Sequence, residues 1–275
     1  PSMINNGTKL DLFINDLIKS ALQMSSTLDS AKRAKKRVTR SKRKIRKLFV
    51  ERFADSEKTL IYVHIGKCGG TTLRHSIKES PVLKGAYKRI LTAHLEKPIV
   101  HKRSHYLVVI RNPIQRAISA FNFQYHHLVT LGHHNTYFAG EYELLRHYGT
   151  LNNLAEALYR DNELCAKASS DFENIYHLHY RISYYLNDLL PVIRPDQMRF
   201  VLSQETLDSD IEELLQVTNT RNIYDYGEKI DAASKQLSSV GYANLKRYLK
   251  DDYLALKQLL KMRNTTNANK DILFK

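Results

Sequence analysis

The chain has 275 residues, a hydrophobic fraction of 43% and a formal net charge of +15 at neutral pH. This length suits one sizeable α/β domain with an appendage, and it is short for two independent enzymatic domains. With two cysteines, 10 glycines and 6 prolines, the composition excludes a disulfide framework and a loop-dominated protein.

Residues 1–55 are predicted to form a helical, Lys/Arg-rich N-terminal extension. Residues 8–28 show the apolar spacing of an amphipathic helix. Residues 32–47 hold 11 Lys or Arg and no acid, which leaves only +4 for the rest of the chain. Nucleic acid is therefore a disfavoured partner. Residues 32–47 could instead bind an anionic polymer or an acidic membrane surface, or form a solvated helix at a dimer contact.

The cellular location is predicted from what the chain lacks. No apolar run approaches the ~18–20 residues of a membrane span, and the N-terminus has no basic-then-apolar leader. Two cysteines fit a reducing compartment. We expect a cytoplasmic protein, with peripheral membrane attachment through the N-terminal extension as an open alternative.

Residues 56–275 are predicted to form one α/β domain. Short apolar runs rich in β-branched residues predict strands at 60–65, 89–92, 106–110 and 198–202. Helices are predicted at 71–79, 113–129, 140–147, 151–168, 172–190, 207–217, 231–249 and 251–262. Because strands alternate with helices, we expect a parallel β-sheet of about four or five strands flanked by helices.

The segment between the first predicted strand and the next helix is rich in glycine. Lys67 precedes Gly69 and Gly70, and Thr71 and Thr72 follow them. Glycines let the backbone approach an anion closely, and the N-terminus of the following helix attracts negative charge. This predicts a P-loop-type sheet with a phosphate cradle. The order differs from the ATP/GTP motif, in which Lys follows the last Gly, and a glycine-rich turn without a ligand stays open.

A second anion site is predicted at the end of the third strand. Arg111 ends the strand, and Asn112 and Pro113 have the residue types of a helix N-cap and first helical position. Arg116 and Ser119 are expected on the helix edge opposite the sheet-packing face. Arg111 and Ser119 suit a phosphate, whereas a nucleotide triphosphatase usually places a Mg²⁺-binding acid here. Pairing of Arg111 with a structural carboxylate is the alternative.

Both segments resemble a known family. Residues 67–73 resemble the 5′-phosphosulfate loop of sulfotransferases that use 3′-phosphoadenosine 5′-phosphosulfate (PAPS). Residues 109–113, with Arg116, Ser119 and Phe121, resemble their 3′-phosphate motif. The similarity is greatest to the carbohydrate branch, which includes the heparan sulfate enzymes and bacterial relatives. It extends over roughly residues 58–262.

The resemblance implies roles for particular residues. Lys67 would contact the phosphosulfate and stabilise the leaving phosphate during catalysis. The other donor-binding residues would be Gly69, Gly70, Thr71 and Thr72 at the 5′-phosphate, and Arg111 and Ser119 at the 3′-phosphate. His94 matches the family's general base, with Glu96 as the alternative, and His64 is expected to be structural. The product would be 3′-phosphoadenosine 5′-phosphate (PAP), with no metal required.

The expected acceptor is a carbohydrate or glycolipid hydroxyl. Residues that could line its cleft follow the second phosphate motif: Tyr125, His126, His127, His133, His134 and Tyr137. Their spacing matches no metal site. Two other classes remain open, an ATP-dependent P-loop phosphotransferase and a non-enzymatic basic anion-binding module. The oligomeric state is open as well, with a homodimer as one outcome.

Overall fold

A computed structural model describes residues 59–133, 136–218, 235–262 and 273–274. The predicted N-terminal extension, with its helix at 8–28 and its basic run at 32–47, lies outside these residues, as does His134. None of the helices described is both long enough and apolar enough to cross a membrane.

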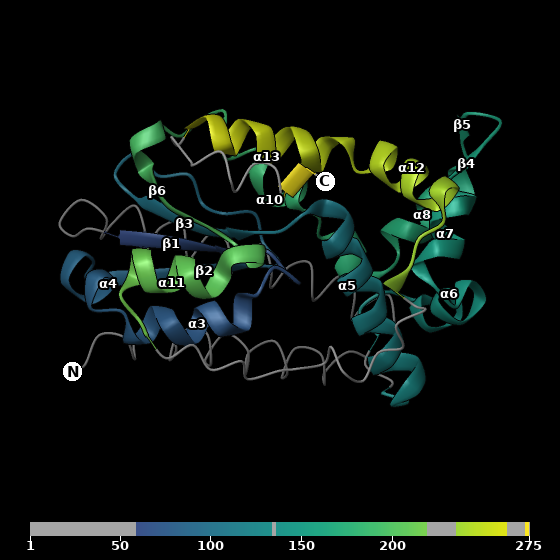
Figure 1. The fold of residues 1–275 in the computed structure, drawn as a ribbon, viewed down its shortest axis with the longest axis horizontal. Helices are drawn as coiled ribbons and strands as arrows, with labels where there is room; N and C mark the ends of the chain where they lie inside the picture. Colours follow the sequence, from purple (N-terminus) through teal and green to yellow (C-terminus); the bar gives the residue numbers. More distant parts are fainter. Residues whose placement is uncertain (1–58, 134–135, 219–234, 263–272, 275) are drawn as a thin grey trace, which may run out of the picture.

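The centre of the molecule is a parallel four-stranded sheet with the order β2-β1-β3-β6. This confirms the predicted α/β class with a P-loop-like sheet flanked by helices (Figure 1). The ends of each strand lie within two residues of the predicted ones. The strands are β1 (Thr59–His64), β2 (Arg89–His94), β3 (His105–Ile110) and β6 (Met198–Ser203).

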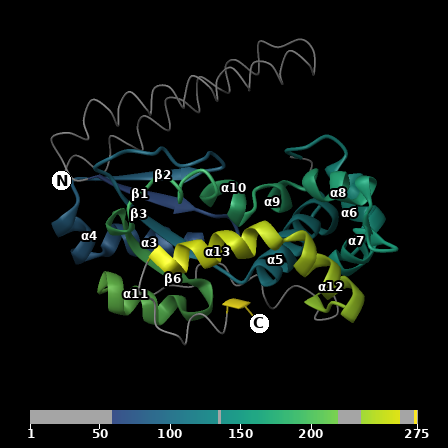
Figure 2. The ribbon, with the colours of Figure 1, turned by 90° about the horizontal axis from the view of Figure 1, so that it is seen from above.

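Helices cover both faces of the sheet (Figures 1 and 2). The lower face in Figure 1 carries α3 (Gly70–Glu79), α4 (Pro81–Ala86) and α11 (Leu207–Leu215). The upper face carries α10 (Ile182–Leu186) and α13 (Lys250–Met262). Their apolar side chains and those of the strands form one cluster, which we call the sheet core. Such double coverage explains why β3 is apolar on both of its faces.

The remaining helices gather beside the sheet, at the right of Figure 1. They pack around a second apolar cluster, the helical core. Its elements are α5 (Pro113–Tyr125), the π-helical turn η1 (His126–Thr130), α6 (Glu141–Tyr148), α7 (Leu151–Ala157), α8 (Ala166–Glu173), α9 (Tyr176–His179) and α12 (Ser239–Tyr248). Short 3₁₀ turns flank β6: η2 (Pro195–Gln197) and η3 (Gln204–Thr206).

Two of the predicted helices are wrong. The helix expected over 151–168 stops at Ala157, and a hairpin of β4 (Tyr159–Arg160) and β5 (Glu163–Leu164) follows. Its turn residues, Asp161 and Asn162, have φ values of 49° and 66°. Asp and Asn tolerate this left-handed region better than most residues, so the pair forms a turn. The helix expected over 172–190 is divided among the end of α8, α9 and α10.

The other helices differ from prediction at their ends. After Tyr125, α5 continues as η1 rather than as regular α-helix. Of the helix predicted at 231–249, residues 231–234 lie outside the described part, and α12 begins after Ser238, whose side chain accepts a hydrogen bond from Gly241 N. Gln216, with φ 54°, ends α11 at Leu215.

Candidate functional site

The predicted anion sites lie at the ends of neighbouring strands. β1 and β3 are adjacent in the sheet, while β2 lies on the other side of β1. After β1 the chain therefore passes to β2 on one side, whereas after β3 it passes to β6 on the other. At such a switch point the connections diverge and leave room for a ligand at the carboxyl ends of the strands. Residues 65–69, which we call the glycine loop, follow β1, and Arg111 follows β3.

Backbone conformation and packing require both glycines at the start of α3, independently of any ligand. Gly69 has φ 80°, and a Cβ there would lie 2.6 Å from Leu207 Cδ2. A Cβ on Gly70 would lie 2.0 Å from His64 Nε2. Gly69 is the N-cap of α3 and supplies no side-chain cap. The first-turn N–H groups of α3 therefore lack that capping partner, with Thr71 exposed and Thr72 half-buried beside them.

Lys67 has a left-handed backbone, with φ 69°. Its Nζ lies 3.8 Å from the centroid of the Phe123 ring. Burial, together with the charges of Arg111 and Arg116, lowers the pKa of Lys67 to about 8. Within the described residues no carboxylate pairs with this ammonium. The site is therefore deficient in negative charge, which an anionic ligand would supply.

Among the residues described, the partner of the Arg111 guanidinium is the glycine loop and not a carboxylate. Its Nη1 donates to the Lys67 carbonyl oxygen at 3.1 Å. Its Nε is buried and lacks a hydrogen-bond partner in the described part of the chain. Burial lowers the pKa of Arg111, although nearby Cys68 and Glu205 act in the opposite direction. Glu205 itself accepts from the Asn112 N–H at 2.8 Å and from the Ser203 hydroxyl.

Arg116 corrects one prediction. It was expected on an edge of α5 away from the packed face, but it is 1% exposed. Its Nε donates to Gly66 O at 3.0 Å, and its Nη2 donates to His177 O and Tyr180 O at 2.7 and 2.6 Å. The expectation failed because the glycine loop and α9 cover this side of α5, which local periodicity does not reveal. Arg116 thus joins three separate segments.

Ser119 lies further along α5 and is half-buried. Among the residues that the structure describes, none forms a hydrogen bond with the Ser119 side chain, Arg111 included. The predicted pairing of Arg111 with Ser119 around one phosphate therefore stays a prediction. Lys67, Gly69, Gly70 and Arg111 come together around the glycine loop, with Thr71 and Thr72 on the adjoining turn.

His94 and His64 end neighbouring strands in register. Their rings stack with centroids 4.3 Å apart, and His94 Nδ1 lies 3.5 Å from His64 O. Burial, reinforced by His94 and Arg74, lowers the pKa of His64 to about 3. The ring of His64 packs between Tyr62, His94 and Gly70, at the end of the sheet as predicted. Its Nδ1 is nevertheless buried without a hydrogen-bond partner among the described residues.

Sequence reasoning missed His177. Its Nδ1 lies 3.1 Å from the position that a Cβ on Gly66 would occupy, and its ring centroid lies 5.3 Å from that of Phe123. Burial, then Lys67, Arg116 and the histidines of β1 and β2, hold the pKa of His177 well below its usual value. No motif marks this residue, because only the tertiary fold brings α9 to the glycine loop.

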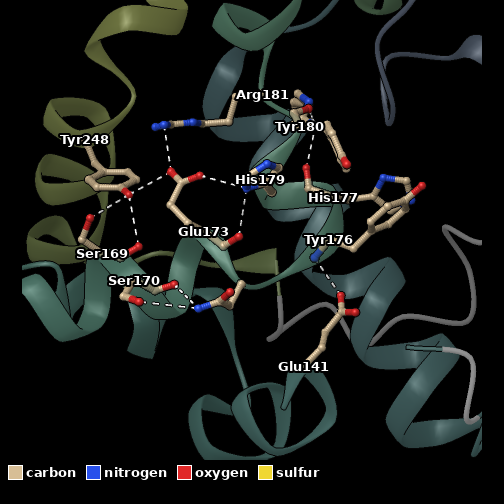
Figure 3. Close-up of polar contacts among 12 residues, drawn as sticks. Glu141, Ser169, Ser170, Glu173, Tyr176, His177, His179, Tyr180, Arg181 and Tyr248 are labelled. Carbon is tan, nitrogen blue, oxygen red and sulfur yellow. Dashed lines mark hydrogen bonds and ion pairs between the residues drawn. The ribbon is translucent and has the colours of Figure 1, made fainter. Parts of the chain in front are cut away.

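Charged residues hold the short helix α9 at both ends (Figure 3). The buried carboxylate of Glu141 accepts from Tyr176 N at 2.8 Å. At the C-terminal end of α9, His179 Nδ1 lies 3.4 Å from the Glu173 carboxylate, which also pairs with Arg181 at 2.8 Å. The same carboxylate accepts from the Tyr248 hydroxyl at 3.1 Å. Burial tends to raise the pKa of Glu173, but His179 and Arg181 bring it below its usual value.

The predicted acceptor-lining residues separate into three groups. His127 stacks on Phe123, the ring beneath Lys67, with centroids 5.7 Å apart, and the ring of His133 lies 4.4 Å from that of His127. Tyr137 stacks on Tyr176 at 3.8 Å. Tyr125 instead stacks on Phe121 and packs against the helical core. His126, on the same π-helical turn as His127, lowers the pKa of His127 after burial and His133.

The fold and the site together define a class, an α/β protein with a P-loop-like parallel sheet and a cationic glycine loop at its switch point. Among the described residues, no three or more His, Cys, Asp or Glu are grouped so that they could hold a metal ion. No known protein family matches the chain, and no curated protein sequence matches it either. The roles of the residues therefore rest on the chain's own chemistry.

Proposed function

We propose that the protein is a PAPS-dependent O-sulfotransferase whose acceptor is a carbohydrate-type hydroxyl. One observation carries the proposal. Two half-buried cations, Lys67 and Arg111, follow the ends of adjacent parallel strands, and Arg111 Nη1 bonds directly to the Lys67 carbonyl. A donor with phosphate-like groups at both ends meets the needs of both cations at once.

The residues suit this donor. The ammonium of Lys67 and the open first turn of α3, with Thr71 and Thr72, would hold the 5′-phosphosulfate. The buried Nε of Arg111 has no hydrogen-bond partner in the described chain, and its N–H group would bind the 3′-phosphate, aided by Ser119. Bound PAPS supplies a sulfuryl group activated by its bond to phosphate.

The transfer proceeds in line and needs a base at the acceptor. The acceptor oxygen bonds to sulfur as the bond from sulfur to the phosphate oxygen breaks, and PAP leaves. Lys67 stabilises the negative charge that develops on the leaving phosphate. His94 takes the acceptor proton. The His64 carbonyl near its Nδ1 favours the tautomer whose Nε2 accepts that proton.

The donor is tested by thermal unfolding with PAP and with ATP plus Mg²⁺. The proposal expects PAP to raise Tm and ATP plus Mg²⁺ to do so far less, because only PAP carries the 3′-phosphate. Labelled sulfate should then pass from PAPS to a glycan. Stabilisation by ATP plus Mg²⁺ alone would favour a phosphotransferase. Loss of all anion binding on deletion of residues 1–50 would favour a basic binding module.

The base is tested by His94→Gln. We expect kcat to fall by about 10²–10⁴-fold while PAP still stabilises the protein, because the imidazole acts only in the chemical step. His75→Gln is the matched control, since His75 lies on α3 in a half-exposed ion pair with Glu79. An unchanged kcat for His94→Gln would transfer the role to another group, Glu96 being the first to examine.

The proposal places the protein in the cytoplasm. Cys68 and Cys165 are both free thiols, and burial raises the pKa of Cys68 to about 12. Two unpaired cysteines suit the reducing cytoplasm, where PAPS would be available without transport. Fractionation of the native protein would test this placement.

A further inference from the structure

A band of aromatic rings borders the site on its α9 side. We call it the aromatic arc and define it as Tyr137, Phe138, Tyr176, His179, Tyr180 and Tyr184. Successive centroids are close: 3.8 Å between Tyr137 and Tyr176, 5.4 Å between Tyr176 and Tyr180, and 5.0 Å between Tyr180 and Tyr184. The arc is therefore a continuous chain of ring contacts, stacked between Tyr137 and Tyr176 and edge-to-face in the other two pairs.

Tyr176 links the arc to Lys67 through two further rings. The ring of Tyr176 lies 4.8 Å from that of His177, which lies 5.3 Å from Phe123, the ring beneath the Lys67 ammonium. Figure 3 shows Tyr176 and His177 side by side on α9. Two rings, His177 and Phe123, therefore connect the arc to the group proposed to stabilise the leaving phosphate.

One end of the arc reaches the strand that carries His94. The Tyr184 hydroxyl donates to Leu95 O at 3.4 Å, and Leu95 N donates to the Tyr185 hydroxyl at 3.3 Å. Leu95 follows His94 directly and has φ 60°, a conformation that leucine rarely adopts. The tyrosines hold this strained residue in place. The arc therefore lies between segments that carry Lys67 and His94, the two groups between which an acceptor hydroxyl must lie.

Several of these rings are open to solvent. Tyr137 is 54% exposed, and Phe138, His179, Tyr180 and Tyr184 are half-buried. Tyr176 is buried and supports Tyr137 from below. Tyrosine offers an electron-rich face and a hydroxyl. A sugar ring offers the complementary pair, a face of polarised C–H groups and a rim of hydroxyls.

We infer that the aromatic arc is the acceptor subsite and that it binds an oligosaccharide by stacking successive sugar rings. This inference rests on the proposed sulfuryl transfer, because that reaction gives Lys67 and His94 their roles on either side of the acceptor. A small aromatic alcohol would occupy one ring at most and would leave the rest of the arc unused. The arc thus favours an acceptor with two or more sugar units.

Direct binding tests the inference without the donor. The probes are cellotetraose, chitotetraose and a tetrasaccharide of alternating uronic acid and glucosamine, each compared with its monosaccharide by calorimetry. At least one tetrasaccharide should bind more tightly than its monosaccharide. Tyr137→Ala and Tyr184→Ala should each weaken that binding about tenfold, while Tyr137→Phe and Tyr184→Phe should stay within about twofold.

The matched control is Tyr159→Ala, because Tyr159 lies on the β4–β5 hairpin and stacks with Arg247 rather than with the arc. PAP should stabilise all five variants as well as it stabilises the unaltered protein. The inference is overturned if no tetrasaccharide binds, or if the alanine variants bind it unchanged. Ring-dependent binding without any effect of PAP would remove the proposed transfer and keep the sugar site, so the two failures are distinguishable.

Discussion

Lys67 carries a charge that its surroundings disfavour. Burial and two neighbouring guanidinium groups lower its pKa, and the face of Phe123 offsets only part of that cost. A lysine in this situation gains from an anionic ligand, because the anion favours the protonated form and raises the pKa again. Protonation of Lys67 and binding of the donor are therefore linked.

This linkage predicts a pH dependence. The pKa of Lys67 in the free protein is about 8, below the 10.5 of an unperturbed lysine. Below pH 8 the ammonium is present and PAP affinity should be nearly constant. As the pH rises above 8 the ammonium is lost, so Kd should increase by up to about tenfold per pH unit. Calorimetry between pH 6.5 and 9.5 measures this.

Lys67→Arg is the control, because a guanidinium keeps its proton throughout this range. The variant should show a flat profile over the same interval, even if its affinity is lower. If the unaltered protein and Lys67→Arg had the same profile, the pH dependence would belong to another group.

Gly70 supports a prediction about stability at the same site. Gly70→Ala places a methyl group where His64 Nε2 lies 2.0 Å away, so we expect overpacking to cost about 1–3 kcal/mol. Gly85→Ala is the control, since nothing lies within 4 Å of its Cβ and alanine favours helix α4 by about 1 kcal/mol. Urea unfolding should move the two variants in opposite directions. Equal stability of Gly70→Ala and the unaltered protein would contradict the packing argument.

At the scale of elements, Arg116 connects segments that are distant in sequence. It lies on α5, and its guanidinium bonds to carbonyls of the glycine loop, of α9 and of the residue after α9. The planar group donates in several directions from one rigid fork, which an ammonium does not match. The positions of Lys67 and His177 therefore depend on a residue that need not touch any ligand.

Arg116→Met should destabilise the protein by about 3–5 kcal/mol, because three carbonyls around the buried guanidinium lose their donor. Arg116→Lys should recover only part of this loss. Arg146→Met, at an exposed position on α6, should change stability by about 0.5 kcal/mol or less. The measurement is the free energy of unfolding in urea. A loss for Arg116→Met no larger than for Arg146→Met would exclude the connecting role.

At the scale of the whole molecule, two cores share one long helix. Tyr253 of α13 packs in the helical core, whereas Leu256 and Leu259 of the same helix pack in the sheet core. The glycine loop lies near the junction, since Arg116 reaches it from α5. Because rigid elements span both cores, the described structure should unfold as one cooperative unit.

Core truncations test this. Leu107→Ala in the sheet core and Leu154→Ala in the helical core should each cost about 2–5 kcal/mol, since both leucines are fully buried. Both variants should lower the Tm of a single calorimetric transition. Leu254→Ala is the control and should have little effect, because the Leu254 side chain on α13 is 50% exposed. Two separate transitions, each responding to one variant, would show that the cores unfold independently.

The sequence by itself determined the strands and the order of sheet and helix, because buried parallel strands leave short apolar runs that local chemistry reveals. It also placed Lys67 and Arg111 after strands, since motif and strand end are adjacent in the chain. It did not reveal the hairpin at Asp161 and Asn162, where two turn residues outweigh a helical pattern.

Only the tertiary structure decided which residues meet at the glycine loop. His177 and the rings of the aromatic arc follow Lys67 by about 70 to 117 positions along the chain, and of these residues the sequence pointed only to Tyr137. The sequence predicted Arg116 on an edge of its helix, but α9 covers it in the structure. The physical reason is that periodicity reports the face a helix turns toward its core, whereas contacts between distant segments depend on how whole elements pack.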